Sequence, residues 1–239
     1  LILRQNKFFM KKKNSTEKQF ANIESGLSKT EQFIEDNRKV LLSIIGGIII
    51  IFTAYYGYDN MYKKPLNIKA QKQLFIAEQY FEKDSFNLAL NGNNEFSGLI
   101  DIIESFSSTK SGSIAKYYAG ISYLNIGQYK NAIQMLDQYK SNDKLLMSIA
   151  QTAIGDAFSE INQPNDAIEY YEKAISIYEN QLTTPIILIK SAKLHELNQD
   201  YKKAIECYEL IKNKYPKSET AKSTDKHINY LTFLKNQDK

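Results

Sequence analysis

The carboxy-terminal two-thirds of the chain repeats a pattern of small and aromatic residues at a nearly constant spacing. Three alanines mark the repeat, because Ala132, Ala167 and Ala204 lie 35 and 37 residues apart. A small residue stands twelve positions before each alanine, at Gly120, Gly155 and Ala192. A period of this size is typical of helical hairpins that stack on their neighbours, so the repeat predicts a solenoid built of α-helices.

The repeated positions have a packing logic. A small side chain lets two helices approach closely, and an aromatic ring one turn later fills the groove beside it. Gly127 stands where the first helix of a copy must end, Asn162 and Gln199 replace it in the other copies, and residues 163–166 break two helices apart. We therefore predict structural roles for eight repeat positions: Gly120, Tyr123, Ala132, Gly155, Ala167, Tyr171, Ala204 and Tyr208.

These spacings resemble the tetratricopeptide repeat, in which a small residue, an aromatic and a turn precede an alanine and a second aromatic. The resemblance predicts three repeats over residues 114–216 and a capping helix and tail over residues 217–239. Residues 63–113 are expected to form a linker and a divergent first repeat. Its insertion, which begins at the turn cluster 91–94, either belongs to a binding surface or elaborates the capping hairpin.

An apolar run ahead of the repeats is long enough to cross a membrane. Residues 40–58 carry no charged side chain, and at about 1.5 Å of helical rise per residue they reach roughly the thickness of a hydrocarbon core. A buried helix or a signal peptide explains the run less well, because Ile48 to Ile51 leave no polar face and a long polar segment comes first. We predict a cytoplasmic tail with an amphipathic helix (residues 1–37) and a transmembrane helix (residues 38–62).

The predicted fold is therefore all-α, with a single N-terminal transmembrane helix followed by a tetratricopeptide-type solenoid of about three to four hairpins. Lysines flank the apolar run on both sides, so local charge decides its orientation poorly. Because a long carboxy-terminal domain can be exported largely regardless of its charge, we expect the amino terminus inside. The expected location is a bacterial inner membrane, with the repeats in the periplasm.

The sequence offers little for catalysis. His195, His227 and Cys207 are the only histidines and cysteine, and none has the spacing of metal ligands. His195 stands at an aromatic repeat position, and Cys207 is most simply a small apolar residue. The formal charge of +4 is spread along the chain, which gives no case for nucleic acid. We expect neither an enzyme nor a cofactor, metal or small-molecule substrate.

The whole chain is similar to the YfgM-like family, ancillary subunits of the bacterial Sec translocon. Three segments look more closely like tetratricopeptide membrane proteins of the Bacteroidetes, namely residues 30–35, 77–86 and 115–120. The resemblance implies partners near the translocon: the translocon itself, a periplasmic chaperone of the peptidyl-prolyl isomerase class, and secreted chains. The alternative is a scaffold for another envelope assembly, such as outer-membrane protein insertion or cell-wall synthesis.

The inner wall of such a solenoid is made mostly by the first helix of each hairpin, and it suits an extended or helical segment of a partner. Five residues of the predicted first helices are not reserved for packing by the repeat pattern, and they form the candidate partner-binding wall: Lys116, Tyr117, Gln151, Lys190 and Lys193. The alternative is that these are ordinary solvated positions.

Overall fold

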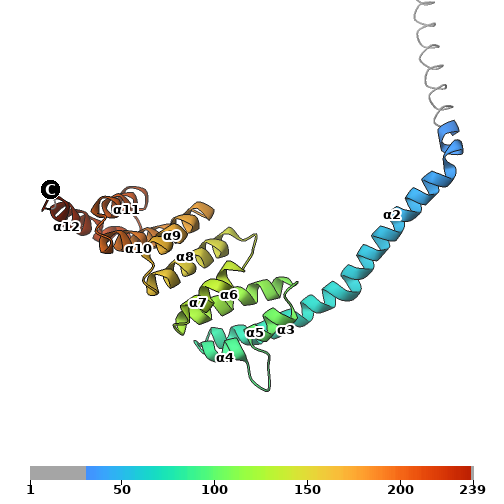
Figure 1. Ribbon diagram of the computed structural model, residues 1–239, viewed down its shortest axis with the longest axis horizontal. Helices are drawn as coiled ribbons and strands as arrows, with labels where there is room; N and C mark the ends of the chain where they lie inside the picture. The colour runs from blue at the N-terminus through green and yellow to red at the C-terminus, as the bar shows by residue number, and fades with distance from the viewer. Residues whose placement is uncertain (1–30, 238–239) are drawn as a thin grey trace, which may run out of the picture. The chain divides into compact units, whose positions relative to one another are not determined.

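The computed structural model describes residues 31–237 (Figure 1). Contacts between Cα atoms divide the chain into two units, Leu1–Tyr62 and Lys63–Lys239, and each is described separately. Most of the tail predicted for residues 1–37, with its amphipathic helix, lies outside the described residues. Residues 31–36 are helical.

The described part of the first unit is dominated by one apolar helix, α2 (Arg38–Tyr58), followed by a π-helical turn at Asp59–Lys63. Its large apolar side chains are exposed, with Ile50 and Ile51 each at 69%. Within residues 31–237 one helical stretch, Arg38–Phe81, is long and apolar enough to cross a membrane, and none of its apolar window is buried.

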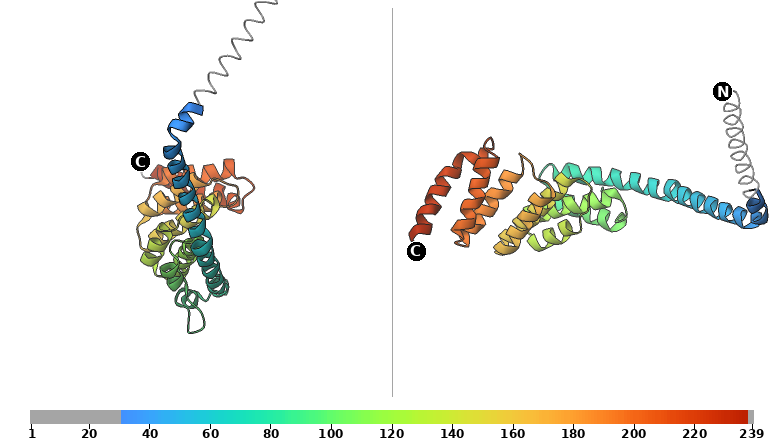
Figure 2. Two further views of the ribbon diagram at one scale, coloured as in Figure 1. Left: turned by 90° about the vertical axis from the view of Figure 1, so that its right-hand side faces the viewer. Right: turned by 90° about the horizontal axis from the view of Figure 1, so that it is seen from above.

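The second unit is a right-to-left series of helices in Figure 1, with no β-strand among its described residues. One isolated bridge joins Gly92 to Ser97. Each helix contacts its neighbour in the chain, and the view from above in Figure 2 shows the last helices lying side by side. The helices are α3 (Lys64–Phe81), α4 (Phe86–Asn91), α5 (Leu99–Ser105), α6 (Lys110–Asn125), α7 (Tyr129–Asp137), α8 (Lys144–Glu160), α9 (Pro164–Ile177), α10 (Thr184–Leu197), α11 (Tyr201–Lys214) and α12 (Thr224–Gln237).

Four hairpins share one turn geometry. A single residue with positive φ ends the first helix of each, at Asp84, Gly127, Asn162 and Gln199. In every case the next residue donates its N–H to a carbonyl five positions earlier, over 2.8 to 2.9 Å, which is the closing bond of a Schellman motif. The accepting carbonyls belong to Tyr80, Tyr123, Phe158 and His195, so the divergent first hairpin follows the same plan as the three clear repeats.

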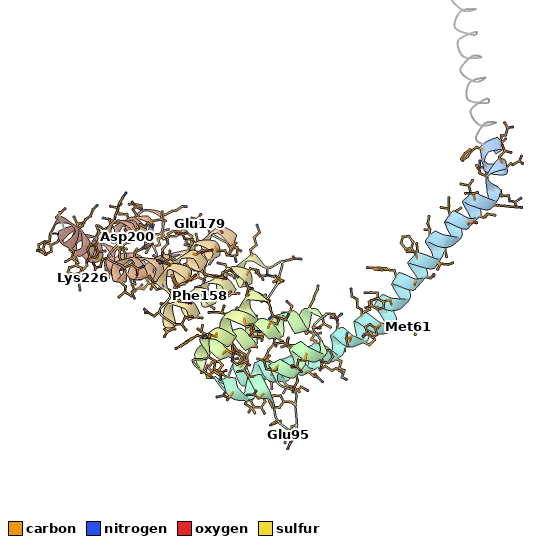
Figure 3. The ribbon with its side chains drawn as sticks, in the orientation of Figure 1. Met61, Glu95, Phe158, Glu179, Asp200 and Lys226 are labelled. Carbon is orange, nitrogen blue, oxygen red and sulfur yellow. The ribbon has the colours of Figure 1, made fainter. Side chains whose placement is uncertain are left out.

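The first hairpin differs in its second half, where two short helices, α4 and α5, replace one. Glu95 lies at the tip of the loop that joins them (Figure 3). The ring of Phe96 stacks on Tyr80 with centroids 4.6 Å apart, which fastens the loop to α3. Leu99 and Ile102 of α5 are fully buried in the first core cluster. The insertion is therefore partly core structure.

Small residues stand where the helices of a hairpin touch. A Cβ atom on Gly155 would lie 2.5 Å from the Tyr171 ring, and one on Gly120 would lie 2.4 Å from Leu136 Cγ. Ala167 and Ala204 are fully buried at the matching positions of the second helices. These contacts explain why the repeat pattern holds small residues there.

Helix α12 closes the last hairpin. Leu231 is buried at 1% exposure, and Ile228 and Leu234 pack against the same cluster as Tyr208 and Tyr215. Its opposite face carries two exposed rings, Tyr230 and Phe233. The helix thus covers the apolar end of α11 and leaves a second apolar face open.

Candidate functional site

A groove of about 540 Å³ lies along the first helices of the three clear repeats. Side chains of α8 and α10 make most of its walls, and α6, α7 and α9 add one each. Its lining combines leucine side chains with charged and hydroxyl groups: Leu124, Tyr129, Asp156, Ser159, Glu160, Tyr171, Lys190, Lys193, Leu194 and Leu197. A concave surface of mixed apolar and polar character is a typical binding site.

Asp156 organises the wall of the groove. It accepts a hydrogen bond of 2.7 Å from the Tyr171 hydroxyl, and Lys190 Nζ lies 2.7 Å from each of its carboxylate oxygens. Burial, and then the charge of Asp156, raises the pKa of Tyr171 above its usual value, so the phenol stays protonated and donates. These contacts join α8, α9 and α10, and they hold two repeats in register.

The next hairpin repeats this arrangement. The Tyr208 hydroxyl donates to Glu196 Oε1 over 2.5 Å, and burial is the main reason why the pKa of Tyr208 is raised. His227 of α12 stacks on the Tyr208 ring at 4.7 Å, and its Nδ1 atom lies 3.6 Å from the same Glu196 oxygen. The capping helix is thereby tied to the second helix of the last hairpin.

Two groups in the groove keep charge available for a ligand. Lys193 is exposed, and it makes no hydrogen bond or ion pair within residues 31–237. Glu160 is also exposed, and only the Tyr129 hydroxyl contacts it, over 3.3 Å. Leu197 lines the same groove and exposes 77% of its surface. A partner can therefore bury an apolar side chain in the groove and pair with both charges.

Isoleucines fill one partly exposed repeat position outside the lining of the groove. Ile114, Ile149 and Ile186 stand six positions before Gly120, Gly155 and Ala192, so they occupy one repeat position in α6, α8 and α10. Ile114 is 36% exposed, Ile186 is 47% exposed and Ile149 is half-buried, and none belongs to a core cluster of the described residues. Apolar residues at one exposed repeat position are typical of a contact surface.

The five residues predicted for the partner-binding wall do not lie together. Lys190 and Lys193 line the groove, although Lys190 is held by Asp156. Lys116 is half-buried outside the groove lining, and Tyr117 packs its ring on Tyr139 in a core cluster. The first helices thus contribute fewer free polar groups than the pattern indicated.

The expectation that Gln151 faces solvent is wrong. It is only 4% exposed, and its Oε1 atom has no hydrogen-bond partner among the described residues. In the third repeat the same position holds Leu188, which is 5% exposed and packs in a core cluster. The position is a packing site in both repeats, and the polarity of Gln151 concealed this.

The sequence reasoning also missed Asp156, Glu160 and Leu197. A signal was present, because Asp156 and Lys193 each follow the small residue of their repeat, and Glu160 and Leu197 each stand five positions after it. A residue about one and a half helical turns after a buried position can lie on the exposed inner face. Which of these side chains reach the groove depends on how adjacent hairpins stack.

Within residues 31–237 no three His, Cys, Asp or Glu side chains are grouped so that they could hold a metal ion. Burial raises the pKa of Cys207 above that of an ordinary thiol, which keeps it protonated and weakly nucleophilic at neutral pH.

The stacked hairpins with their shared turns define a helical-repeat protein of the tetratricopeptide type. Two crystal structures of nearly identical TPR-like repeats, from a Podosopora anserina chain described as a kinesin light chain, match the fold with TM-scores of 0.53 and 0.54. Each is 15% identical in sequence to this chain. The matches cover 71% of this chain and 87% and 88% of the two solved chains. At this identity the likeness concerns the fold alone.

The family comparison is more specific. The model described as "SNAP: Soluble NSF attachment protein, SNAP" matches residues 115–235, about half of the chain, so the chain belongs to the soluble NSF attachment protein family. The match begins in α6 and ends in α12, and it therefore includes the groove. A comparison with curated protein sequences finds no match.

Proposed function

We propose that this protein is a membrane-anchored interaction protein that holds a segment of a partner protein in the groove between α6 and α10. The observation that carries the proposal is that one groove is lined by the exposed Leu197, the free ammonium of Lys193 and the carboxylate of Glu160. Burying an apolar side chain gives binding energy, and complementary charges in the same groove favour one orientation of the partner. The family's name describes an attachment protein for NSF, and an attachment role agrees with a groove of this kind.

The anchor is the apolar helix α2. Its exposed isoleucines have no partner surface within residues 31–62, and its length matches a hydrocarbon core. We propose that α2 spans a bacterial inner membrane once, with the amino terminus in the cytoplasm and the repeats in the periplasm. The support is the length of the carboxy-terminal unit, which can be exported whatever its charge.

For the partner we propose the neighbourhood of the Sec translocon, as an ancillary subunit that binds a periplasmic chaperone or emerging secreted chains. The support is the order of tail, membrane helix and repeats, together with the resemblance of three segments to tetratricopeptide membrane proteins. The second candidate is a scaffold for another envelope assembly. The same groove could serve either function, because its residues can bind a segment of a partner protein but do not determine which complex that partner belongs to.

The test compares two lysines. Lys193→Glu reverses the free charge in the groove, whereas Lys226→Glu makes the same change on α12, where Lys226 is exposed and unpaired within the described residues (Figure 3). Proteins crosslinked to the full chain in native membranes are then identified by mass spectrometry. We expect Lys193→Glu to lose partners that Lys226→Glu retains, and translocon or chaperone peptides among them. Equal crosslinks in both variants contradict the groove, and peptides of another assembly support the second candidate.

A further inference from the structure

A second pocket, of about 390 Å³, lies between α9, α10 and α11. It shares no lining residue with the groove. Three carboxylates, of Glu169, Glu172 and Asp200, face it together with the single ammonium of Lys203. His195 also lines it and is the only imidazole that does so.

His195 stands at a position that the other clear repeats fill with larger rings, Tyr123 and Phe158. Phe158 uses its ring for packing, because it stacks on Tyr170 with centroids 5.2 Å apart. His195 has no ring partner and no side-chain hydrogen bond within residues 31–237, although it is only 7% exposed. Its ring nitrogens are not among the side-chain atoms closed off from solvent, so they open to the pocket, where a partner can reach them.

The protonation state of His195 decides which kind of ligand group its ring nitrogens can bind. Burial lowers the pKa of His195, against the opposing charges of Asp200, Glu172 and Glu206. The ring is therefore neutral at pH 7, and one of its nitrogens is a hydrogen-bond acceptor. A ligand group that binds to that nitrogen must therefore donate a hydrogen bond.

Two carboxylates of the pocket are also free to accept hydrogen bonds from a ligand. Glu169 and Glu172 are one helical turn apart on α9, and neither makes an ion pair or a side-chain hydrogen bond within the described part of the chain. Asp200 is already engaged, since it caps α11 through the Lys203 amide at 3.2 Å and lies 3.6 Å from Lys203 Nζ. The pocket thus offers two free carboxylates and one neutral acceptor.

We propose that this pocket binds the guanidinium group of an arginine side chain presented by a partner protein. A guanidinium has five N–H donors in one plane, so it can serve two carboxylates and an imidazole nitrogen together. An ammonium has the charge but lacks the planar fork, and it should bind more weakly. A metal ion fits poorly, because the described residues hold no group of ligands placed for one.

The site is independent of the groove, and it would add a second contact for a partner that carries both an apolar segment and an arginine. Two linked contacts bind more tightly than either alone when the linker spans both sites. The proposal therefore extends the proposed function without resting on it.

The experiment uses histidine-labelled full chain in detergent micelles at pH 7.5 and constant ionic strength. The chain has two histidines, so the His227→Gln variant assigns the His195 imidazole signals in the NMR spectrum. The probe is N-acetyl-arginine methylamide, and the matching lysine and citrulline compounds are the comparisons. We expect a saturable shift of His195 with the arginine probe, at least fivefold weaker binding of the lysine probe, and no saturation with uncharged citrulline.

Two double variants locate the binding. Glu169→Gln with Glu172→Gln should weaken arginine binding at least tenfold. Glu104→Gln with Glu209→Gln removes the same charge from exposed positions outside the pocket and should change it less than twofold. Citrulline binding as tight as arginine, an equal loss in both double variants, or no shift of His195 in the folded wild type overturns the proposal. Equal binding of lysine overturns the guanidinium preference.

Discussion

The Tyr171 hydroxyl donates a 2.7 Å hydrogen bond to Asp156, and the same carboxylate holds Lys190 of the next hairpin. Tyr171 is 2% exposed, so its ring belongs to the core while its hydroxyl reaches the groove. A single carboxylate thus links packing within one repeat to the wall that a partner would contact. Substitutions at Asp156 should therefore affect the stability of the fold more than the binding of a partner.

We expect Asp156→Ala to lower the free energy of unfolding by about 1–3 kcal/mol, because it leaves a buried phenol without an acceptor. Tyr171→Phe removes the other partner, and the double variant should cost less than the sum of the two. Urea unfolding of the fragment Lys63–Lys239, followed by circular dichroism, measures all three. Strictly additive effects would show that the hydrogen bond contributes nothing.

Gly155→Ala should destabilise the same fragment by about 1–3 kcal/mol, since the added Cβ would overlap the Tyr171 ring in a filled core. Gly155→Leu and Ala167→Arg place more bulk at the same contact and should be worse. Gln134→Leu adds bulk at an exposed position of α7 and serves as the control. Wild-type melting temperature in the Gly155 variants would mean that the repeat register is wrong.

Much of the solenoid could be predicted from the sequence because its turns and contacts are local. Gly127, Asn162 and Gln199 mark three hairpins directly, and the positive φ at Asp84 shows why the fourth follows the same rule. The groove was less predictable, because side chains from three hairpins meet there only after stacking. Gln151 was predicted to lie on the wall because it is polar, although its side chain occupies a packing position.

The pH dependence of stability should report His195. Its pKa in the folded state is lowered by burial, so as the pH falls below about 6.5 the unfolded chain takes up the proton first. The stabilisation is complete above that pH and is lost as the pH falls through the folded pKa. His195→Phe should reduce the loss of unfolding free energy between pH 7.5 and 5.5, whereas His227→Gln should leave the contribution of His195 in place. If His195→Phe has the same pH dependence of unfolding free energy as the wild type, His195 is not the source of that dependence.

The proposed orientation can be tested with a single thiol. Lys235→Cys in a Cys207→Ser background places the only cysteine in α12. A membrane-impermeant maleimide should label it in cells whose outer membrane alone has been opened, and a cytoplasmic marker protein should stay unlabelled. Labelling that requires an open inner membrane would reverse the topology and remove the periplasmic partners from consideration.

The most direct test of the groove compares two leucines of nearly equal exposure, Leu197 at 77% and Leu182 at 74%. Leu197 lines the groove, whereas Leu182 lies between α9 and α10 outside its lining. A photo-crosslinking amino acid is placed at each position in the full chain, and crosslinked partners are collected from native membranes. We predict a discrete partner band from position 197 that is absent from position 182. Identical bands from both positions, or none from position 197 in a folded chain, would contradict the account.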